Sequence, residues 1–174
     1  MFQRRPMKII WMFLFIFNIT VYNVSASDGL LEFRLAQENE KANTEIIMGR
    51  NGTKLYVDKI PFLTLSEISE VNLKVDKSPP PLWLKLAVEA TGSKIEGPQV
   101  EIEIVLNDSG REINSKVTSE NAGKKVAIFL QGKLVLEPVI HGKIDTKSIM
   151  ITTGYEEDEA RDLVAEINKK IKRN

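Results

Sequence analysis

The chain has 174 residues, of which 43% are hydrophobic and 28% charged, with equal numbers of basic and acidic side chains. This length and composition are typical of one globular domain with its own core. The absence of cysteine excludes disulfides, thiolate catalysis and cysteine-ligated zinc or iron–sulfur clusters.

Residues 1–26 predict a secretory signal peptide. Three basic residues precede the apolar run 9–17, and Val24 and Ala26 flank Ser25 at the end of the segment. A basic start, a short apolar core and a small-x-small end are the features of a cleavable leader. The alternative is an uncleaved anchor, but the apolar run is shorter than the ~20 residues that a spanning helix needs.

Cleavage after Ala26 leaves a domain of residues 27–174 with 21 basic and 24 acidic side chains. This net charge of −3 argues against a nucleic-acid partner and gives no attraction to an anionic membrane surface. We expect a periplasmic or otherwise exported protein with no integral membrane domain after cleavage. Anchoring by an uncleaved N-terminal segment is the alternative location.

Two strands are expected near the start of the domain. Residues 30–36 alternate apolar and charged side chains, which indicates a half-buried strand. The polar stretch 37–45 predicts a loop or a weak helical turn. Residues 49–52 read Gly-Arg-Asn-Gly, which indicates a turn, and a second strand is expected over 53–60.

A helix is expected over 67–75, because Ile68, Val71 and Val75 fall on one side of a helical projection. Ser66 is the expected cap, and Leu65 ahead of it is placed to act as a hydrophobic staple. Three consecutive prolines at 79–81 end any helix before them and form a stiff connector.

Residues 82–90 and 100–106 alternate clearly, and their closeness in sequence predicts an antiparallel hairpin. A helix follows over 107–123, where Asp108 or Ser109 is the expected cap and Gly123 the expected end.

The C-terminal part predicts three strands and a helix. Strands are expected at 125–130, 134–140 and 147–153, the first two joined by a Gln-Gly-Lys turn. The last helix has one apolar stripe and charges that match the helix dipole. Its apolar stripe consists of Ala160, Leu163, Val164, Ile167 and Ile171. The fold class expected for 27–174 is therefore α+β, with a mixed or antiparallel sheet covered by helices.

No enzyme active site is expected. His141 is the single imidazole, and Asp145 and Ser148 lie near it in sequence, but a triad requires proximity in space. Glu101 and Glu103 could form a carboxylate pair, although two glutamates on an alternating strand are more typical of a solvated face. We assign no catalytic, cofactor or metal-binding residue, expect no cofactor, and leave the binding surface unassigned.

Pro138 gives the one functional indication that the residues offer directly. Proline cannot donate a hydrogen bond within a sheet, so the strand over 134–140 is expected at an edge or at a bend. Edge strands can accept another polypeptide by strand addition.

The motifs from Leu30 to Ile167 resemble the first periplasmic domain of SecD, specifically its head, in their order and spacing. The segments LEFRLA and VEIEIVLNDSGREI look like two of its passages. The other positions that match its motifs are Asn121, Gly123, Lys124, Gly132, Lys133, Pro138, Ile140, Gly154, Tyr155, Glu157, Glu159, Ala160 and Leu163. Gln131 and Glu156 depart from the usual Asp and Thr, so the last helix should be less well capped.

This resemblance implies a SecD head-like domain exported without the membrane helices of SecD. It implies a non-catalytic module that engages translocated or unfolded polypeptides in protein export, with the Sec translocase as a partner. The alternative is a structural or inhibitory envelope protein that binds one folded partner, because a fold does not fix a function.

Overall fold

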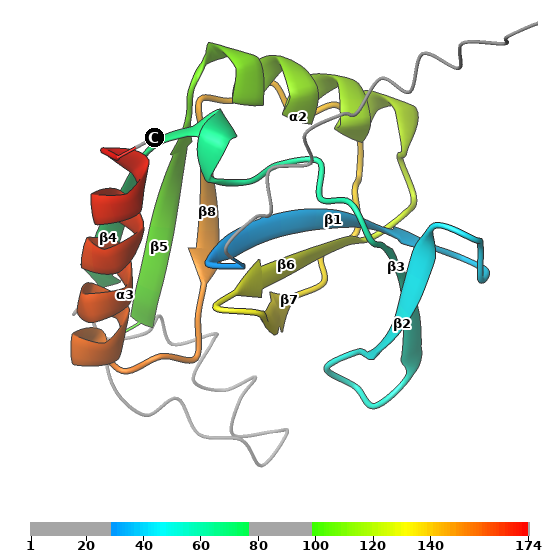
Figure 1. Cartoon of the computed structure of the whole chain (residues 1–174), viewed down its shortest axis with the longest axis horizontal. Helices are drawn as coiled ribbons and strands as arrows, with labels where there is room; N and C mark the ends of the chain where they lie inside the picture. The colour runs from blue at the N-terminus through cyan, green and yellow to red at the C-terminus, as the bar shows by residue number, and fades with distance from the viewer. Residues whose placement is uncertain (1–28, 77–98, 174) are drawn as a thin grey trace, which may run out of the picture.

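The computed structural model describes residues 29–76 and 99–173, which form an α+β fold with two antiparallel sheets (Figure 1). This confirms the expected fold class. The expected leader, the proline connector and the strand expected at 82–90 lie outside the described residues. Within the described ranges, none of the helices has the length and apolar character needed to span a membrane.

The larger sheet has five strands. Their spatial order is β2 (Thr44–Met48), β3 (Lys54–Asp58), β1 (Leu31–Gln37), β6 (Val126–Leu130) and β7 (Lys133–Leu136). β1 is central and pairs with β6 over five of its residues, from Leu31 to Leu35. The strands expected at 30–36 and 53–60 and the hairpin expected at 125–140 are confirmed, but β2 was not predicted.

The smaller sheet has three strands. Their spatial order is β4 (Ile68–Asp76), β5 (Gln99–Leu106) and β8 (Ser148–Thr152). The strands expected at 100–106 and 147–153 are therefore confirmed. The expected pairing of 100–106 with 82–90 is not found, because β4 and β8 occupy the two edges of β5.

The helix expected over 67–75 is wrong, because this segment forms strand β4. A 3₁₀ helix, η1 (Leu65–Glu67), precedes the strand, and Thr64 rather than Ser66 caps it in a capping box with Glu67. The register of β4 shifts between Ile68 and Glu70, as in a β-bulge. This bulge lets Ile68 and Val71 both face the core, which gives a strand the three-residue spacing of a helix.

The C-terminal helix α3 (Glu157–Ile171) confirms the expected amphipathic stripe. Ala160, Leu163 and Ile167 are buried in the core. Glu156 is the N-cap residue, and its side chain makes no capping hydrogen bond. The departure from threonine at this position therefore leaves the helix start without a side-chain cap, as expected.

Helix α2 (Asp108–Glu120) is also found where a helix is expected, but its cap is Asn107. The Asn107 Oδ1 atom accepts a hydrogen bond from the Gly110 amide at 2.9 Å, while Nδ2 donates to the Ser66 carbonyl at 2.8 Å. The expected caps, Asp108 and Ser109, are instead the first helical residues. One asparagine therefore starts α2 and also ties it to η1.

The main core lies between the two sheets and α3, and residues from all three supply it. Central members are Leu31 and Phe33 of β1, Ile128 and Leu130 of β6, Ile102 and Ile104 of β5, and Leu163 and Ile167 of α3. A smaller apolar cluster covers the opposite face of the five-stranded sheet and consists of Ala36, Leu55, Val57, Ala127 and Phe129. Every residue of β6 is consequently buried.

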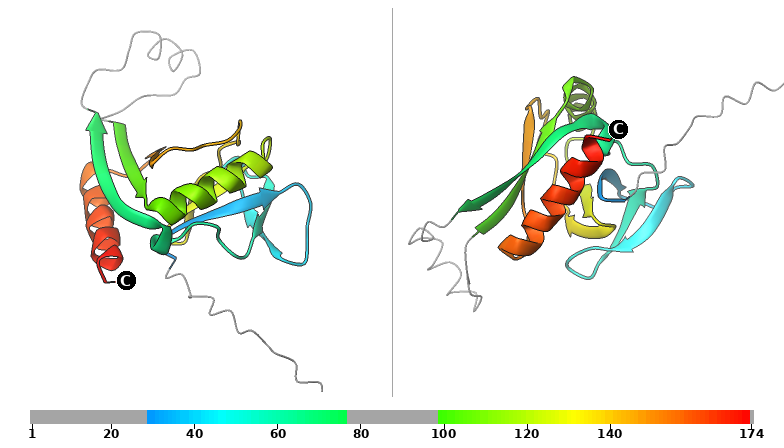
Figure 2. Two further views of the ribbon diagram at one scale, coloured as in Figure 1. Left: turned by 90° about the horizontal axis from the view of Figure 1, so that it is seen from above. Right: turned by 60° about the vertical axis from the view of Figure 1, so that its left-hand side comes forward.

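The elements are arranged so that α3 lies against the smaller sheet at one end of the molecule (Figure 2). The β2–β3 hairpin lies at the opposite end, away from α3 (Figure 1). Both faces of the larger sheet are apolar at its centre, but the outer strand β2 extends beyond the part that the main core covers.

Candidate functional site

The structure does not assemble a catalytic triad around His141. This histidine is exposed. Asp145 points to α2, where its Oδ1 atom accepts a hydrogen bond from Arg111 Nε at 2.7 Å. Ser148 begins β8, and its main-chain oxygen accepts a hydrogen bond from the Thr146 hydroxyl. The three residues that are close in sequence therefore have separate structural roles.

Glu101 and Glu103 lie on the half-exposed face of β5, while Ile102 and Ile104 between and beside them are buried. Glu103 forms an ion pair with Lys74 of β4 at 3.4 Å. This is the solvated face that the alternation indicates. Across residues 29–76 and 99–173, no group of three or more His, Cys, Asp or Glu side chains is placed to hold a metal ion.

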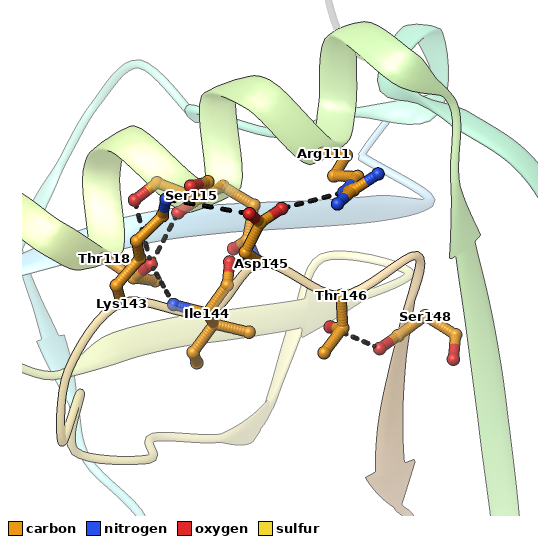
Figure 3. Close-up of polar contacts among 9 residues, drawn as sticks. Arg111, Ser115, Thr118, Lys143, Ile144, Asp145, Thr146 and Ser148 are labelled. Atoms are coloured by element: carbon orange, nitrogen blue, oxygen red, sulfur yellow. Dashed lines mark hydrogen bonds and ion pairs between the residues drawn. The ribbon is translucent and has the colours of Figure 1, made fainter.

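A polar groove runs between α2 and the loop that precedes β8 (Figure 3). Its volume is about 530 Å³, and its lining includes Arg111, Lys116, Lys143 and Asp145. The Arg111 guanidinium holds the pKa of the Asp145 carboxyl below its ordinary value by a hydrogen bond and by its charge, and Lys143 adds to the effect. The charges of the groove are thus mixed, and its best-placed carboxylate is already paired.

Two buried polar residues of α2 fix the loop side of this groove. Asn114 donates a hydrogen bond to the Ile144 carbonyl at 3.2 Å. The Thr118 hydroxyl accepts one from the Ile144 amide at 2.9 Å (Figure 3). Both side chains are at least 97% buried. Because these contacts satisfy the backbone of the loop, we regard the groove as a structural junction.

A second hollow lies on the face of the five-stranded sheet that carries the smaller apolar cluster. Its volume is about 480 Å³, and Phe129 and Ile47 form its apolar part. Arg34 lies over the Phe129 ring at 5.2 Å and bridges the carboxylates of Glu32 and Glu45. The hollow therefore combines an apolar floor with a cation that the protein itself already neutralises.

The sheet edges are the remaining candidates for binding. The strand around Pro138 is confirmed as an edge, since β7 is the last strand of the larger sheet. Beyond β7 the chain stays beside β6, because the Val126 amide donates to the Pro138 carbonyl at 2.9 Å. The other end of this sheet is β2, where Ile46 and Met48 are exposed by 48% and 62%.

Sequence reasoning missed β2, although a signal for it was present. Asn51-Gly52 is a strong hairpin indicator when alternating segments flank it on both sides. The segment after the turn was recognised, while the segment before it, Thr44–Met48, does not alternate and begins inside the polar stretch 37–45. The Asn51-Gly52 turn therefore implied a strand before it as well as the one expected after it.

Comparisons with known proteins show what the domain is similar to. Residues 84–169 match the family model of the SecDF P1 head subdomain. The protein translocase subunit SecD of Aquifex aeolicus is 30% identical over 144 residues, which covers 82% of this chain and 24% of that protein. SecD of Dictyoglomus turgidum is 35% identical over 81 residues, covering 42% of this chain and 20% of that protein.

A solved structure of SecDF, described as a membrane component that enhances protein export, has a similar fold. The TM-score is 0.54 at 18% identity, over 79% of this chain and 61% of that one. The chain thus spans about a quarter or less of these two SecD relatives. The order of motifs, the match to the head model and the shared fold lead to one conclusion: this chain carries a SecD periplasmic head-like domain.

Proposed function

We propose that this chain is a non-catalytic, exported binding module that engages translocated or unfolded polypeptides during protein export. The observation that carries the proposal is the similarity to SecD over 82% of the chain, since the relatives are protein translocase subunits. The expected leader at 1–26 supports an extracytoplasmic location, in the periplasm or its equivalent.

The geometry of the described residues is consistent with binding by surface complementarity. The polar groove has its main carboxylate paired with Arg111, and His141 is exposed. The larger sheet, in contrast, ends in an edge strand that exposes apolar side chains. Extended polypeptides bind to such edges through main-chain hydrogen bonds, which tolerate many sequences.

The direct test is binding of the purified chain to a chemically unfolded exported protein and to the same protein after folding. We expect the unfolded form to bind and the folded form not to bind. Membranes that contain SecD and SecF would serve as a second target, because the Sec translocase is the proposed partner. Binding to neither target would overturn the proposal.

A structural or inhibitory role predicts a different result. A chain that has reused this fold for one folded partner would capture that partner at a fixed stoichiometry and would ignore unfolded polypeptides. Crosslinking in intact cells, followed by identification of the captured proteins, separates the two roles. Many captured export substrates would support the proposed function, and a single partner unrelated to export would contradict it.

A further inference from the structure

The backbone of β2 offers unpaired hydrogen-bonding groups at its outer edge. The Gly49 amide donates to the Thr53 carbonyl at 2.8 Å, and the Lys59 amide donates to the Asn43 carbonyl at 2.9 Å. Hydrogen-bonded and non-hydrogen-bonded pairs alternate along an antiparallel ladder, so these two bonds determine which residues of β2 bond to β3. The N–H and C=O groups of Ile46 and Met48 therefore point away from β3 and toward solvent.

The side chains of the same two residues are the exposed apolar ones. Ile46 and Met48 share one face of β2, next to Tyr56 and Lys54 of β3. This is the face of the sheet that packs on the main core. Phe33 and Leu35 of β1 contact that core, Gln37 lies on the same face two positions further along the strand, and Tyr56 is its cross-strand partner. The main core does not extend to this end of the sheet, so the two side chains are left without cover.

Two of the other edge strands, β4 and β7, carry features that discourage pairing. Asn168 of α3 makes hydrogen bonds with both the amide and the carbonyl of Val71, which closes the outer edge of β4. β7 has only four residues, a register shift opposite Ile128 and a proline shortly after it. Short strands, bulges and prolines are the usual protections of a sheet edge, and β2 has neither a register shift nor a proline.

The remaining outer strand of the smaller sheet, β8, provides a useful comparison. Its one exposed large apolar side chain is Met150, which is 47% exposed and lies between Ile149 and Ile151. The residues two positions away on the same face are Ser148 and Thr152. β8 therefore lacks the pair of adjacent exposed apolar side chains that β2 presents.

Charge near β2 defines the partner further. Arg50 and Lys54 are exposed at the tip of the β2–β3 hairpin, and neither forms an ion pair with another described residue. Lys54 lies directly opposite Met48. A carboxylate on an incoming strand that reaches the end of β2 beside Met48 would find these two cations unneutralised.

We propose that the outer edge of β2 binds an extended polypeptide strand with apolar side chains at alternate positions and an acidic residue at the end beside Met48. This inference rests on the proposed function and names the surface that performs it. One set of side chains on the bound strand covers Ile46 and Met48. The other set faces the hollow formed by Ile47 and Phe129.

The first test uses synthetic peptides and leaves the protein unchanged. The probe alternates valine and threonine and has two glutamates at one end, and its binding to the full chain is followed by fluorescence anisotropy. N-methylation at every second residue blocks the backbone donors on one side of the strand only. We expect one N-methylated set to weaken binding by about tenfold or more and the complementary set to leave it nearly unchanged. Equal effects of both sets would overturn strand pairing.

The second test locates the edge with matched variants. Met48→Lys places a charge on the proposed edge, whereas Met150→Lys makes the same change on the β8 edge. Both positions are exposed, so folding should be preserved in each. With a probe that lacks the two glutamates, so that the new lysine has no carboxylate to attract, we expect Met48→Lys alone to weaken binding about tenfold. Lys54→Glu should weaken binding of the probe with two glutamates and strengthen binding of a version with two lysines in their place. Equal sensitivity of the two methionine variants would overturn the assignment to β2.

The outcomes distinguish this inference from the function on which it rests. If unfolded exported protein binds to the chain, but the probe does not bind and Met48→Lys does not weaken binding of the unfolded protein, the assignment to the β2 edge is wrong and the proposed function stands. If no unfolded protein binds, the proposed function and this inference are both overturned. A concentration-dependent dimer that Met48→Lys dissolves would show that a second copy of the chain occupies β2, which also overturns the inference.

Discussion

The side chain of Asn168 on α3 forms a two-way hydrogen bond with the backbone of Val71 on β4. Its Oδ1 atom accepts from the Val71 amide at 3.0 Å, and its Nδ2 atom donates to the Val71 carbonyl at 2.6 Å. The two residues are 97 positions apart in the sequence. A single amide therefore replaces a neighbouring strand at the outer edge of the smaller sheet.

Replacement of Asn168 by alanine should destabilise the chain by about 2 kcal/mol, since it leaves two partly buried backbone groups of Val71 without partners. Urea unfolding followed by circular dichroism measures the change. Lys169→Ala on the same helix is the control, because its exposed side chain makes no such contact. An Asn168→Ala variant as stable as the control would contradict this account of the edge.

Gly110→Ala should destabilise the protein, although alanine normally favours a helix. A Cβ atom at this position would lie 2.2 Å from the Glu67 carbonyl oxygen, where η1 packs on the start of α2. The resulting displacement should cost about 1–3 kcal/mol, more than the ~1 kcal/mol gained from helix propensity. Thermal unfolding of Gly110→Ala and of the exposed control Glu112→Ala provides the comparison. An increase in melting temperature for Gly110→Ala would exclude the close packing described here.

Glu156→Ser should stabilise α3 by about 1 kcal/mol, because a serine hydroxyl at the N-cap can accept a hydrogen bond that the glutamate does not accept. The matched control is Glu159→Ser, which removes the same charge from the same turn without placing a hydroxyl at the cap. Denaturant midpoints of the two variants separate capping from the helix dipole. Equal midpoints would mean that the cap contributes nothing.

The Asp145 carboxyl should titrate below its ordinary pKa of 3.8, because Arg111 stabilises the charged form. Since the folded-state pKa is lowered, the stabilisation is present above the unfolded value and is lost as the pH falls through the folded value. Arg111→Gln should return the pKa toward 3.8, and Lys143→Gln should raise it less. Carboxyl NMR titration of the wild-type chain and both variants measures this order, and the reverse order would contradict the contact seen in the structure.

Much of this fold could be predicted because its signals are local. The stripe from Ala160 to Ile171 contains a complete helix signal, and the alternation in 100–106 contains a complete strand signal. The β6–β7 hairpin was predicted from its turn, in which Gln131 and Gly132 both have positive φ. Such a two-residue turn specifies its hairpin directly.

The errors arise where tertiary contacts decide the outcome. A bulge gives Ile68 and Val71 a helical spacing, and only the pairing of β4 with β5 shows that the segment is a strand. Asn107 and not Asp108 caps α2, and the Asn107 side chain also donates a hydrogen bond to the distant Ser66 carbonyl, which the local sequence does not reveal. The candidate binding edge was missed for a similar reason, since the exposure of Ile46 and Met48 depends on where the core ends.

The central pairing of β1 with β6 has a consequence for how the molecule acquires its structure. β1 pairs with β3 at only two positions, Ala36 with Val57 and Gln37 with Tyr56, and it obtains most of its ladder from β6. In the proposed export, a chain that crosses the membrane from its N-terminus would present β1 long before β6. Closing so long a loop is slow, so β1 would lack most of its ladder until β6 had been delivered.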